Sequence, residues 1–181
     1  MQPPTASRHA QVRALAVSIV AAALAAIAVF TGLPAPAHAR GVSLREADRW
    51  AKRTYVQLAS RRITFTAVIR RVITAADGST ITAAAAVRRQ SADGTGQIVL
   101  LFRGHGFLGW TSAYETLRLQ LTAAGTRIVV HYGVFRGNDP FCCPSSTKRV
   151  VYRWNGTRVI ASGQPPLIYG RRGQHLHLAG S

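Results

Sequence analysis

The sequence predicts an α+β fold in which one N-terminal amphipathic helix packs on a mainly antiparallel β-meander of about seven strands. Two observations support this prediction. Up to about residue 59, apolar residues recur at spacings of three and four, as they do on one face of a helix. From Arg61 onward, apolar and polar residues alternate, and short turns containing glycine separate the alternating segments. Connections this short favour antiparallel neighbours, because parallel strands need long crossover connections.

The first 39 residues are predicted to be a secretory signal peptide, which export would remove. Arg8 and Arg13 make the start of this segment positive, and an apolar, alanine-rich run covers residues 14–30. The small residues in Ala37-His38-Ala39 predict cleavage after residue 39. The alternative is an uncleaved anchor, although a membrane span needs about 20 apolar residues. Because no cysteine lies near the predicted cut, we expect no lipid attachment there.

The rest of the chain is predicted to form one domain over residues 40–163, followed by a flexible basic tail over residues 164–181. Ser43 and Glu46 have the spacing of a capping box, which predicts the start of a helix. This helix is expected to run to about Ala59. Its apolar face is expected to contain Leu44, Ala47, Ala51, Tyr55 and Leu58.

Several turn signals divide the remainder into strands. Asp77-Gly78 predicts a hairpin between a strand that begins at Arg61 and a return strand over residues 80–89. The apolar run at residues 98–102 is typical of a buried central strand. Asn155-Gly156 predicts a hairpin with a type I′ turn. Further strands are expected at residues 117–121, 128–135, 150–154 and 157–161, and a turn at residues 104–109.

The charge balance predicts a surface that attracts polyanions. The chain has 23 Lys and Arg residues against 6 Asp and Glu residues, a formal net charge of +17 at pH 7. Such a field raises the local concentration of anions. Outside a cell these would be anionic lipids, wall polymers or acidic glycans. We do not expect a nucleic-acid partner, because the chain is predicted to be exported and carries no recognisable nucleic-acid-binding motif.

The distribution of acidic residues argues against acid–base catalysis. Glu46 is expected to cap the helix, and Asp77 and Asp93 precede glycines in turns. Asp48 is spaced for surface ion pairs with helix neighbours three and four residues away. Only Glu115 and Asp139 then remain for a pair of carboxylates such as glycosidases use. We therefore predict that the protein is not an enzyme and holds no metal or other cofactor.

The only cysteines, Cys142 and Cys143, are adjacent in the chain. Consecutive Cα atoms lie about 3.8 Å apart across a trans peptide, whereas disulfides usually span about 4.4–6.8 Å. The pair is therefore a strained vicinal disulfide, two bonds to other molecules, or a free dithiol. A vicinal disulfide would stiffen its loop but closes too small a ring to add much global stability. The candidate binding residues around it are Arg136, Asp139, Phe141, Arg149 and Arg153.

The segments around the cysteines resemble the LppP/LprE-type domain of actinobacterial cell-envelope proteins. The resemblance is carried by Val129-Val130-His131-Tyr132, by Cys142-Cys143-Pro144-Ser145 and by Tyr152-Arg153-Trp154-Asn155-Gly156, and it covers about residues 99–161. It implies a cell-envelope protein and supplies no catalytic residues. Many members are membrane-anchored lipoproteins, so the missing lipobox cysteine is a departure that favours release of this chain.

The leading hypothesis is therefore a secreted or loosely envelope-associated, non-enzymatic domain that binds an anionic or wall-derived partner. Its candidate surface is the arginine-rich face of the sheet together with the cysteine loop. Two alternatives stay open: a thiol/disulfide redox accessory protein that uses Cys142 and Cys143, or a structural module that dimerises through them. The sequence predicts neither the ligand nor the oligomeric state.

Overall fold

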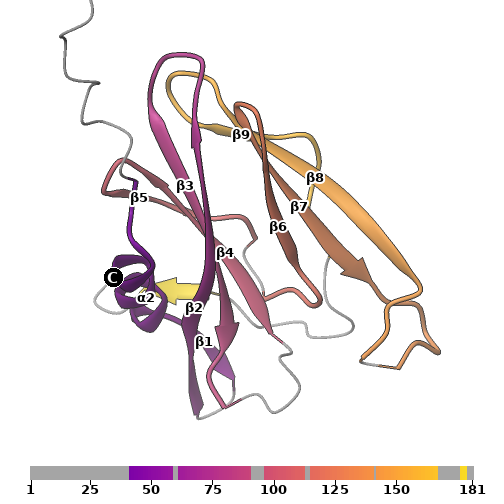
Figure 1. Ribbon diagram of the computed structural model, residues 1–181. Coiled ribbons are helices and arrows are strands. Elements are labelled where there is room, and N and C mark those ends of the chain that lie inside the picture. The colour runs from indigo at the N-terminus through magenta and orange to yellow at the C-terminus, as the bar shows by residue number, and fades with distance from the viewer. Residues whose placement is uncertain are drawn as a thin grey trace, which may run out of the picture. The chain divides into compact units, whose positions relative to one another are not determined.

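The computed structural model describes residues 41–58, 61–90, 96–112, 115–140, 142–166 and 176–178. The predicted signal peptide lies outside the described residues. Every described residue belongs to one compact unit, His38–Ser181. In its described part, that unit contains one helix and two antiparallel sheets (Figure 1).

The first sheet has six strands in the order β10-β1-β2-β3-β4-β5, and the second has four in the order β6-β7-β8-β9. The helix is α2 (Leu44–Arg53). The first sheet contains β1 (Thr54–Leu58), β2 (Arg61–Thr74), β3 (Thr80–Arg88), β4 (Gln97–Arg103), β5 (Gly106–Trp110) and β10 (Leu176–Leu178). The second contains β6 (Gln120–Ala124), β7 (Arg127–Val134), β8 (Ser146–Trp154) and β9 (Val159–Ala161). The mostly antiparallel organisation with one helix is confirmed, whereas a single meander of about seven strands is wrong.

Helix α2 begins where the sequence predicts but ends earlier. The Oγ of Ser43 accepts a hydrogen bond from the backbone N–H of Glu46 at 3.2 Å, so Ser43 is the N-cap. The helix ends at Arg53, because Thr54 is extended and starts β1, which pairs with both β2 and β10. The predicted helix to residue 59 is therefore wrong: Tyr55 and Leu58 lie in a strand. Pairing on both sides of β1 outweighs the helical spacing of these residues.

A β-bulge at Val68 divides β2 into two halves with opposite orientations. The register of β2 against β3 shifts by one residue between Ala67 and Ile69, which leaves Val68 as the extra residue. Before the bulge, Phe65 and Ala67 face the helix, whereas after it Ile69 and Ile73 face the second sheet. The side chain of Asp48 in α2 accepts a hydrogen bond from the backbone N–H of Ala67 at 3.1 Å. This bond connects the helix to β2 beside the bulge.

Strand β3 is buried on both faces. Its alanines alternate between two hydrophobic clusters: Ala83 and Ala85 face the second sheet, and Ala84 and Ala86 face the helix side. The run of alanines at residues 83–86, ambiguous by propensity, is thus a central strand with short side chains. Short side chains there leave room for a layer on each side of the first sheet.

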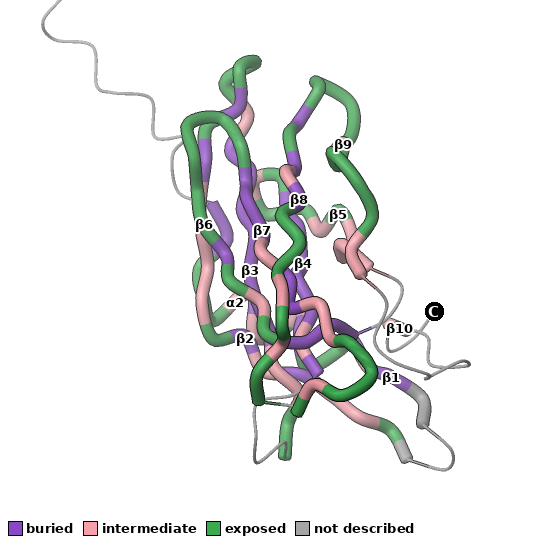
Figure 2. The backbone as a smooth tube through the Cα atoms, turned by 90° about the vertical axis from the view of Figure 1, so that its right-hand side faces the viewer, coloured by how far each residue is buried: buried purple, intermediate pink, exposed green. Residues whose placement is uncertain are grey.

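Two cores result from this arrangement, and Figure 2 shows the buried segments along β3, β4 and β7. The larger core lies between the two sheets and includes Leu101, Val130, Tyr132, Val150 and Trp154. The smaller core lies between α2 and the first sheet and includes Val42, Val56, Phe65, Leu100 and Phe102. Val150, Tyr152 and Trp154 therefore share the inner face of β8, as their alternation predicts.

Other local predictions fail for identifiable reasons. Residues 106–110 form strand β5 rather than a turn. The predicted strand at 117–121 is wrong at its start, because Arg118 has a left-handed backbone (φ 48°) and β6 begins only at Gln120. Gly133 packs beneath this turn, where an added Cβ would lie 2.9 Å from that of Arg118.

The second hairpin prediction holds in place but not in turn type. Trp154 pairs with Val159, so four residues connect β8 to β9 instead of two. The side-chain oxygen of Asn155 accepts the N–H groups of Thr157 and Arg158 at 3.0 and 2.8 Å. Within the predicted tail, residues 176–178 form β10, which pairs with β1. The predicted domain boundaries otherwise stay a prediction.

Candidate functional site

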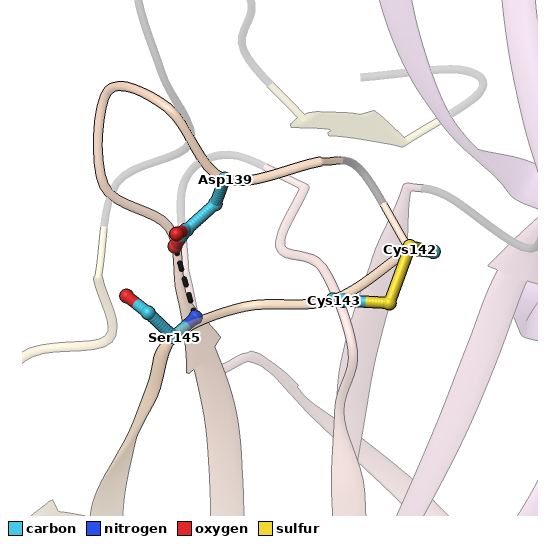
Figure 3. Close-up of a disulfide and its surroundings, with 4 residues drawn as sticks. All are labelled: Asp139, Cys142, Cys143 and Ser145. Carbon is cyan, nitrogen blue, oxygen red and sulfur yellow. Dashed lines mark hydrogen bonds between the residues drawn. A yellow bond between two sulfur atoms is a disulfide. The ribbon is translucent and has the colours of Figure 1, made fainter.

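The cysteine loop connects β7 to β8, and a carboxylate holds its two ends together. Oδ2 of Asp139 accepts the backbone N–H of Arg136 at 2.7 Å and that of Ser145 at 2.9 Å (Figure 3). These two backbone hydrogen bonds lower the pKa of Asp139 below its ordinary value. A carboxylate used in this way closes the loop, so Asp139 has a structural role within it.

Cys142 and Cys143 are exposed within this loop, and their sulfur atoms lie within disulfide distance (Figure 3). Their Cα atoms are 3.8 Å apart, and the described residues contain no cis peptide. The backbone N–H of Cys143 donates to the carbonyl of Pro140 at 2.9 Å, which forms a turn around the pair. Phe141, a predicted binding residue, lies outside the described residues.

The predicted arginines do not gather at one point. Arg149 and Arg153 both lie on the outer face of β8, whereas Arg136 lies in the cysteine loop. This orientation follows from alternation, because the residues between them, Val150 and Tyr152, face the larger core. The arginines therefore form part of an extended surface.

That surface, called here the basic face, is the outer side of the second sheet. It is built from cross-strand rows that the register defines. In one row Arg127 on β7 lies opposite Arg153 on β8, and in another His131 lies opposite Arg149. Between these two rows lies an apolar row, in which Val129 is opposite Val151. Arg127 is a member of this face that the sequence analysis missed, although its alternation with Ile128 and Val130 signals it.

Every acidic residue in the described part of the chain is engaged away from the basic face. The carboxylate of Glu46 contacts Nδ1 of His105 at 3.1 Å. Asp48 pairs with Lys52 at 2.7 Å, and buried Glu115 pairs with Arg88 at 3.6 Å. Asp77 is bonded in the β2–β3 turn, and Asp139 closes the cysteine loop. Glu115 and Asp139 were the two carboxylates that remained as candidates for a catalytic pair. Glu115 instead pairs with Arg88, and Asp139 accepts backbone hydrogen bonds in the cysteine loop.

A buried hydroxyl network lies between the sheets and was also missed. The hydroxyls of Tyr132 and Tyr152 lie 2.8 Å apart, and that of Tyr132 donates to Oγ1 of Thr111 at 3.0 Å. Burial raises the pKa of both tyrosines. The two rings share the inner face with apolar residues, so their alternation alone predicts core positions and not this contact.

The described residues contain no group of three or more His, Cys, Asp or Glu side chains arranged to hold a metal ion. Across the same residues, no helix has the length and apolar character needed to cross a membrane.

Comparison with known proteins identifies one family. Residues 70–157 match the family model described as LppP/LprE lipoprotein, a segment that runs from β2 to the turn after β8 and includes the cysteine loop. No match was found among curated proteins or among solved structures. A lipoprotein family indicates association with the cell envelope. The predicted resemblance is confirmed over residues 70–157, which match the LppP/LprE lipoprotein family.

Proposed function

We propose that this protein is an exported, non-enzymatic binding domain of the cell envelope, and that its basic face binds an extended polyanion. The single observation that carries the proposal is the pair Arg127 and Arg153, which lie directly opposite each other on adjacent strands. Like charges in this position repel and destabilise a sheet. A bound anion between the two guanidinium groups would turn this repulsion into attraction.

The described carboxylates do not relieve this repulsion within the protein. Each of them has a partner elsewhere, and the ion pairs among the described residues are Lys52–Asp48, Arg88–Glu115 and His105–Glu46. Arg127, Arg149 and Arg153 are all exposed, so an external anion can reach them. Guanidinium groups suit carboxylate and phosphate because they form paired hydrogen bonds with either group.

The spacing of the charges favours a polymer over a small anion. Arg149 and Arg153 are four residues apart on one strand, which corresponds to about 13 Å. The apolar row of Val129 and Val151 separates the row of Arg149 from the row of Arg153. A polymer that carries repeated anionic groups can contact both rows at once, so its overall affinity exceeds that of each single weak contact. Wall polymers and acidic glycans have this chemistry.

The engagement of the carboxylates also supports a non-enzymatic role. General acid–base catalysis requires a group positioned to exchange a proton with a substrate. Asp77 and Asp139 instead accept backbone hydrogen bonds, which lower the pKa of each and favour the ionised form. Glu115 is buried beside Arg88.

The test compares two variants with the same change in net charge. The first carries Arg127→Gln, Arg149→Gln and Arg153→Gln on the basic face. The second carries Arg45→Gln, Arg49→Gln and Arg89→Gln, which are exposed positions outside that face. Both are applied to immobilised dextran sulfate and eluted with a salt gradient.

We expect the first variant to elute at clearly lower salt than the wild type, and the second to elute close to it. Exposed charges are screened over about 8 Å at physiological ionic strength, so binding by the face should weaken steeply with added salt. Equal shifts for the two variants would show that net charge alone governs binding, and the proposal would then fail.

A further inference from the structure

A groove of about 470 Å³ opens between the edges of the two sheets. One wall comes from β5 and the residue after it, including Leu108 and Trp110. The other comes from the β8–β9 hairpin, including Arg158, Val159 and Ala161. Figure 2 shows β5 and β9 on the same side of the unit. This volume lies within the range of about 300–1,000 Å³ that is typical of ligand sites.

Among the residues that the structure describes, both walls are edge strands, since β5 ends the first sheet and β9 ends the second. The register shows which backbone groups of β9 are unused by β8. Ser162 donates to the carbonyl of Val151 at 2.9 Å, and Asn155 donates to the carbonyl of Arg158 at 3.2 Å. Hydrogen-bonded pairs alternate along an antiparallel ladder. The N–H and C=O groups of Val159 and Ala161 therefore point away from β8, towards the open side.

The same argument applies to β5. Thr111 donates to the carbonyl of Val99 at 3.0 Å, which makes these residues a hydrogen-bonded pair. The neighbouring pair, Leu100 with Trp110, is then not hydrogen-bonded, and the backbone groups of Trp110 point away from β4. The groove therefore lies beside strand edges whose outward backbone groups can accept and donate hydrogen bonds.

The side chains of the groove add a chemical preference. Leu108 is 43% exposed, which makes it one of only three large apolar side chains exposed in the described part of the chain. The hydroxyl of Tyr152 already forms a hydrogen bond with that of Tyr132, so it does not need a hydrogen-bond partner from a ligand. Arg158 is exposed at the hairpin, and no acidic residue lines the groove.

We propose that this groove binds an extended peptide segment of another protein, which pairs with the edge of β9 and places a carboxylate beside Arg158. Strand addition of this kind takes its affinity from main-chain hydrogen bonds and its specificity from alternate side chains. An apolar residue of the peptide would cover Leu108 and Trp110. The proposal does not depend on the basic face, because Arg127, Arg149 and Arg153 do not line the groove.

The test uses the pentapeptide acetyl-Val-Thr-Val-Thr-Glu with a free C-terminal carboxylate, added to the ¹⁵N-labelled protein. Amide hydrogen exchange is measured by NMR with and without the peptide. We expect amide exchange at Val159 and Ala161 to slow by at least about tenfold when the site is saturated. Pairing with the peptide adds a hydrogen bond that must open before exchange, and a tenfold slowing corresponds to about 1.4 kcal/mol in the free energy of that opening. Exchange at the basic face should stay unchanged.

Two proline variants provide a matched comparison. Ala161→Pro removes an outward N–H at one edge of the second sheet, and edge strands tolerate proline. Ala123→Pro makes the same change on β6, the opposite edge, where the pair Ala123 and Ile128 is also not hydrogen-bonded by the register. We expect Ala161→Pro to abolish peptide binding and Ala123→Pro to preserve it. Arg158→Gln should weaken binding by about threefold, as expected for an exposed charge pair.

Three results would overturn the proposal. The first is equal loss of binding in the two proline variants. The second is protection of Ala161 that rises with protein concentration in the absence of peptide, which would assign the edge to a second copy of this chain. The third is displacement of the peptide by decanoate while the amides of Val159 and Ala161 stay unprotected, which would assign the groove to a hydrocarbon chain such as that of a lipid. The triple arginine variant should bind the peptide normally, so failure of the proposed polyanion site would be recognised separately.

Discussion

Nε1 of Trp154 donates a hydrogen bond to Oδ2 of Asp77 at 2.8 Å, and this contact joins the end of β8 in one sheet to the β2–β3 turn of the other. The backbone N–H of Ser79 donates to the same carboxylate at 2.9 Å. The guanidinium of Arg103 lies 5.0 Å from the centre of the Trp154 ring. One carboxylate in a turn thus links the two sheets directly.

Asp77→Asn should reduce the acid sensitivity of the fold. The backbone hydrogen bond from Ser79, aided by the side-chain hydrogen bond from Trp154, lowers the pKa of Asp77 below its ordinary value in the folded state. A carboxyl group whose pKa is lowered by folding stabilises the protein above its unfolded-state pKa, and this contribution is lost as the pH falls through the lowered value. Thermal unfolding followed between about pH 7 and pH 2 should show the wild type more stable than the variant at neutral pH.

The difference in melting temperature between the two proteins should then shrink below about pH 4. A difference that stays constant down to about pH 2 would mean that the charge of Asp77 does not contribute and that only its shape matters.

Removing the hydroxyls of Tyr132 and Tyr152 should reveal their coupling. Tyr132→Phe and Tyr152→Phe should each cost about 0.5–1.5 kcal/mol of unfolding free energy, because each removes a buried hydrogen bond. The double variant should cost less than the sum, since the bond between the two hydroxyls is lost only once. Urea denaturation of all four proteins measures this difference. Strictly additive costs would contradict a direct hydrogen bond.

Replacing both cysteines should hardly change global stability. A bond between adjacent residues closes too small a ring to restrict the unfolded chain, and Asp139 closes the loop independently. We expect Cys142→Ser with Cys143→Ser to keep the melting temperature within about 2 °C, whereas Asp139→Ala should speed amide exchange at Arg136 and Ser145. Calorimetry and NMR check the two effects. A large fall in melting temperature for the serine variant would assign the cysteines a role in the fold.

Deleting Val68 should preserve the fold, because Ile69 would then follow Ala67 directly and keep its place opposite Ala85. Successive side chains of a strand point to opposite faces, so Ile69 and Ile73 would still face the second sheet. Circular dichroism should show a cooperative thermal transition, and its loss would mean that the bulge itself is needed for folding. The matched control is Val68→Thr, which keeps the bulge at a half-exposed position and should change the unfolding free energy by less than about 0.5 kcal/mol.

The sequence predicted those features that depend on neighbouring residues. Ser43 caps the helix, Asp77-Gly78 turns β2 into β3, and the apolar run at 98–102 lies in a buried strand, all as expected. In each case a local hydrogen bond or a short apolar pattern determines the structure. The position of the Asn155-Gly156 hairpin was predicted for the same reason, although an Asn side chain closes a longer turn.

Features that depend on distant residues were missed. The alternation of β2 continues through Val68 without interruption, so the bulge leaves no local trace, and the division into two sheets was missed with it. Strand β1 reads as helix because its partners, β2 and β10, are needed to make it a strand. At the basic face, Arg149 and Arg153 were predicted from β8 alone. Arg127 was missed because the predicted strand began at residue 128, one residue after it, and its place opposite Arg153 depends on the register.

The four alanines of β3 have an evolutionary consequence. Ala83 and Ala85 adjoin the second sheet, and Ala84 and Ala86 adjoin the helix side, so a larger residue at one position would displace only the layer it faces. Related sequences should therefore covary in two independent groups. Changes at 83 and 85 would be matched in β7 or β8, and changes at 84 and 86 would be matched in α2.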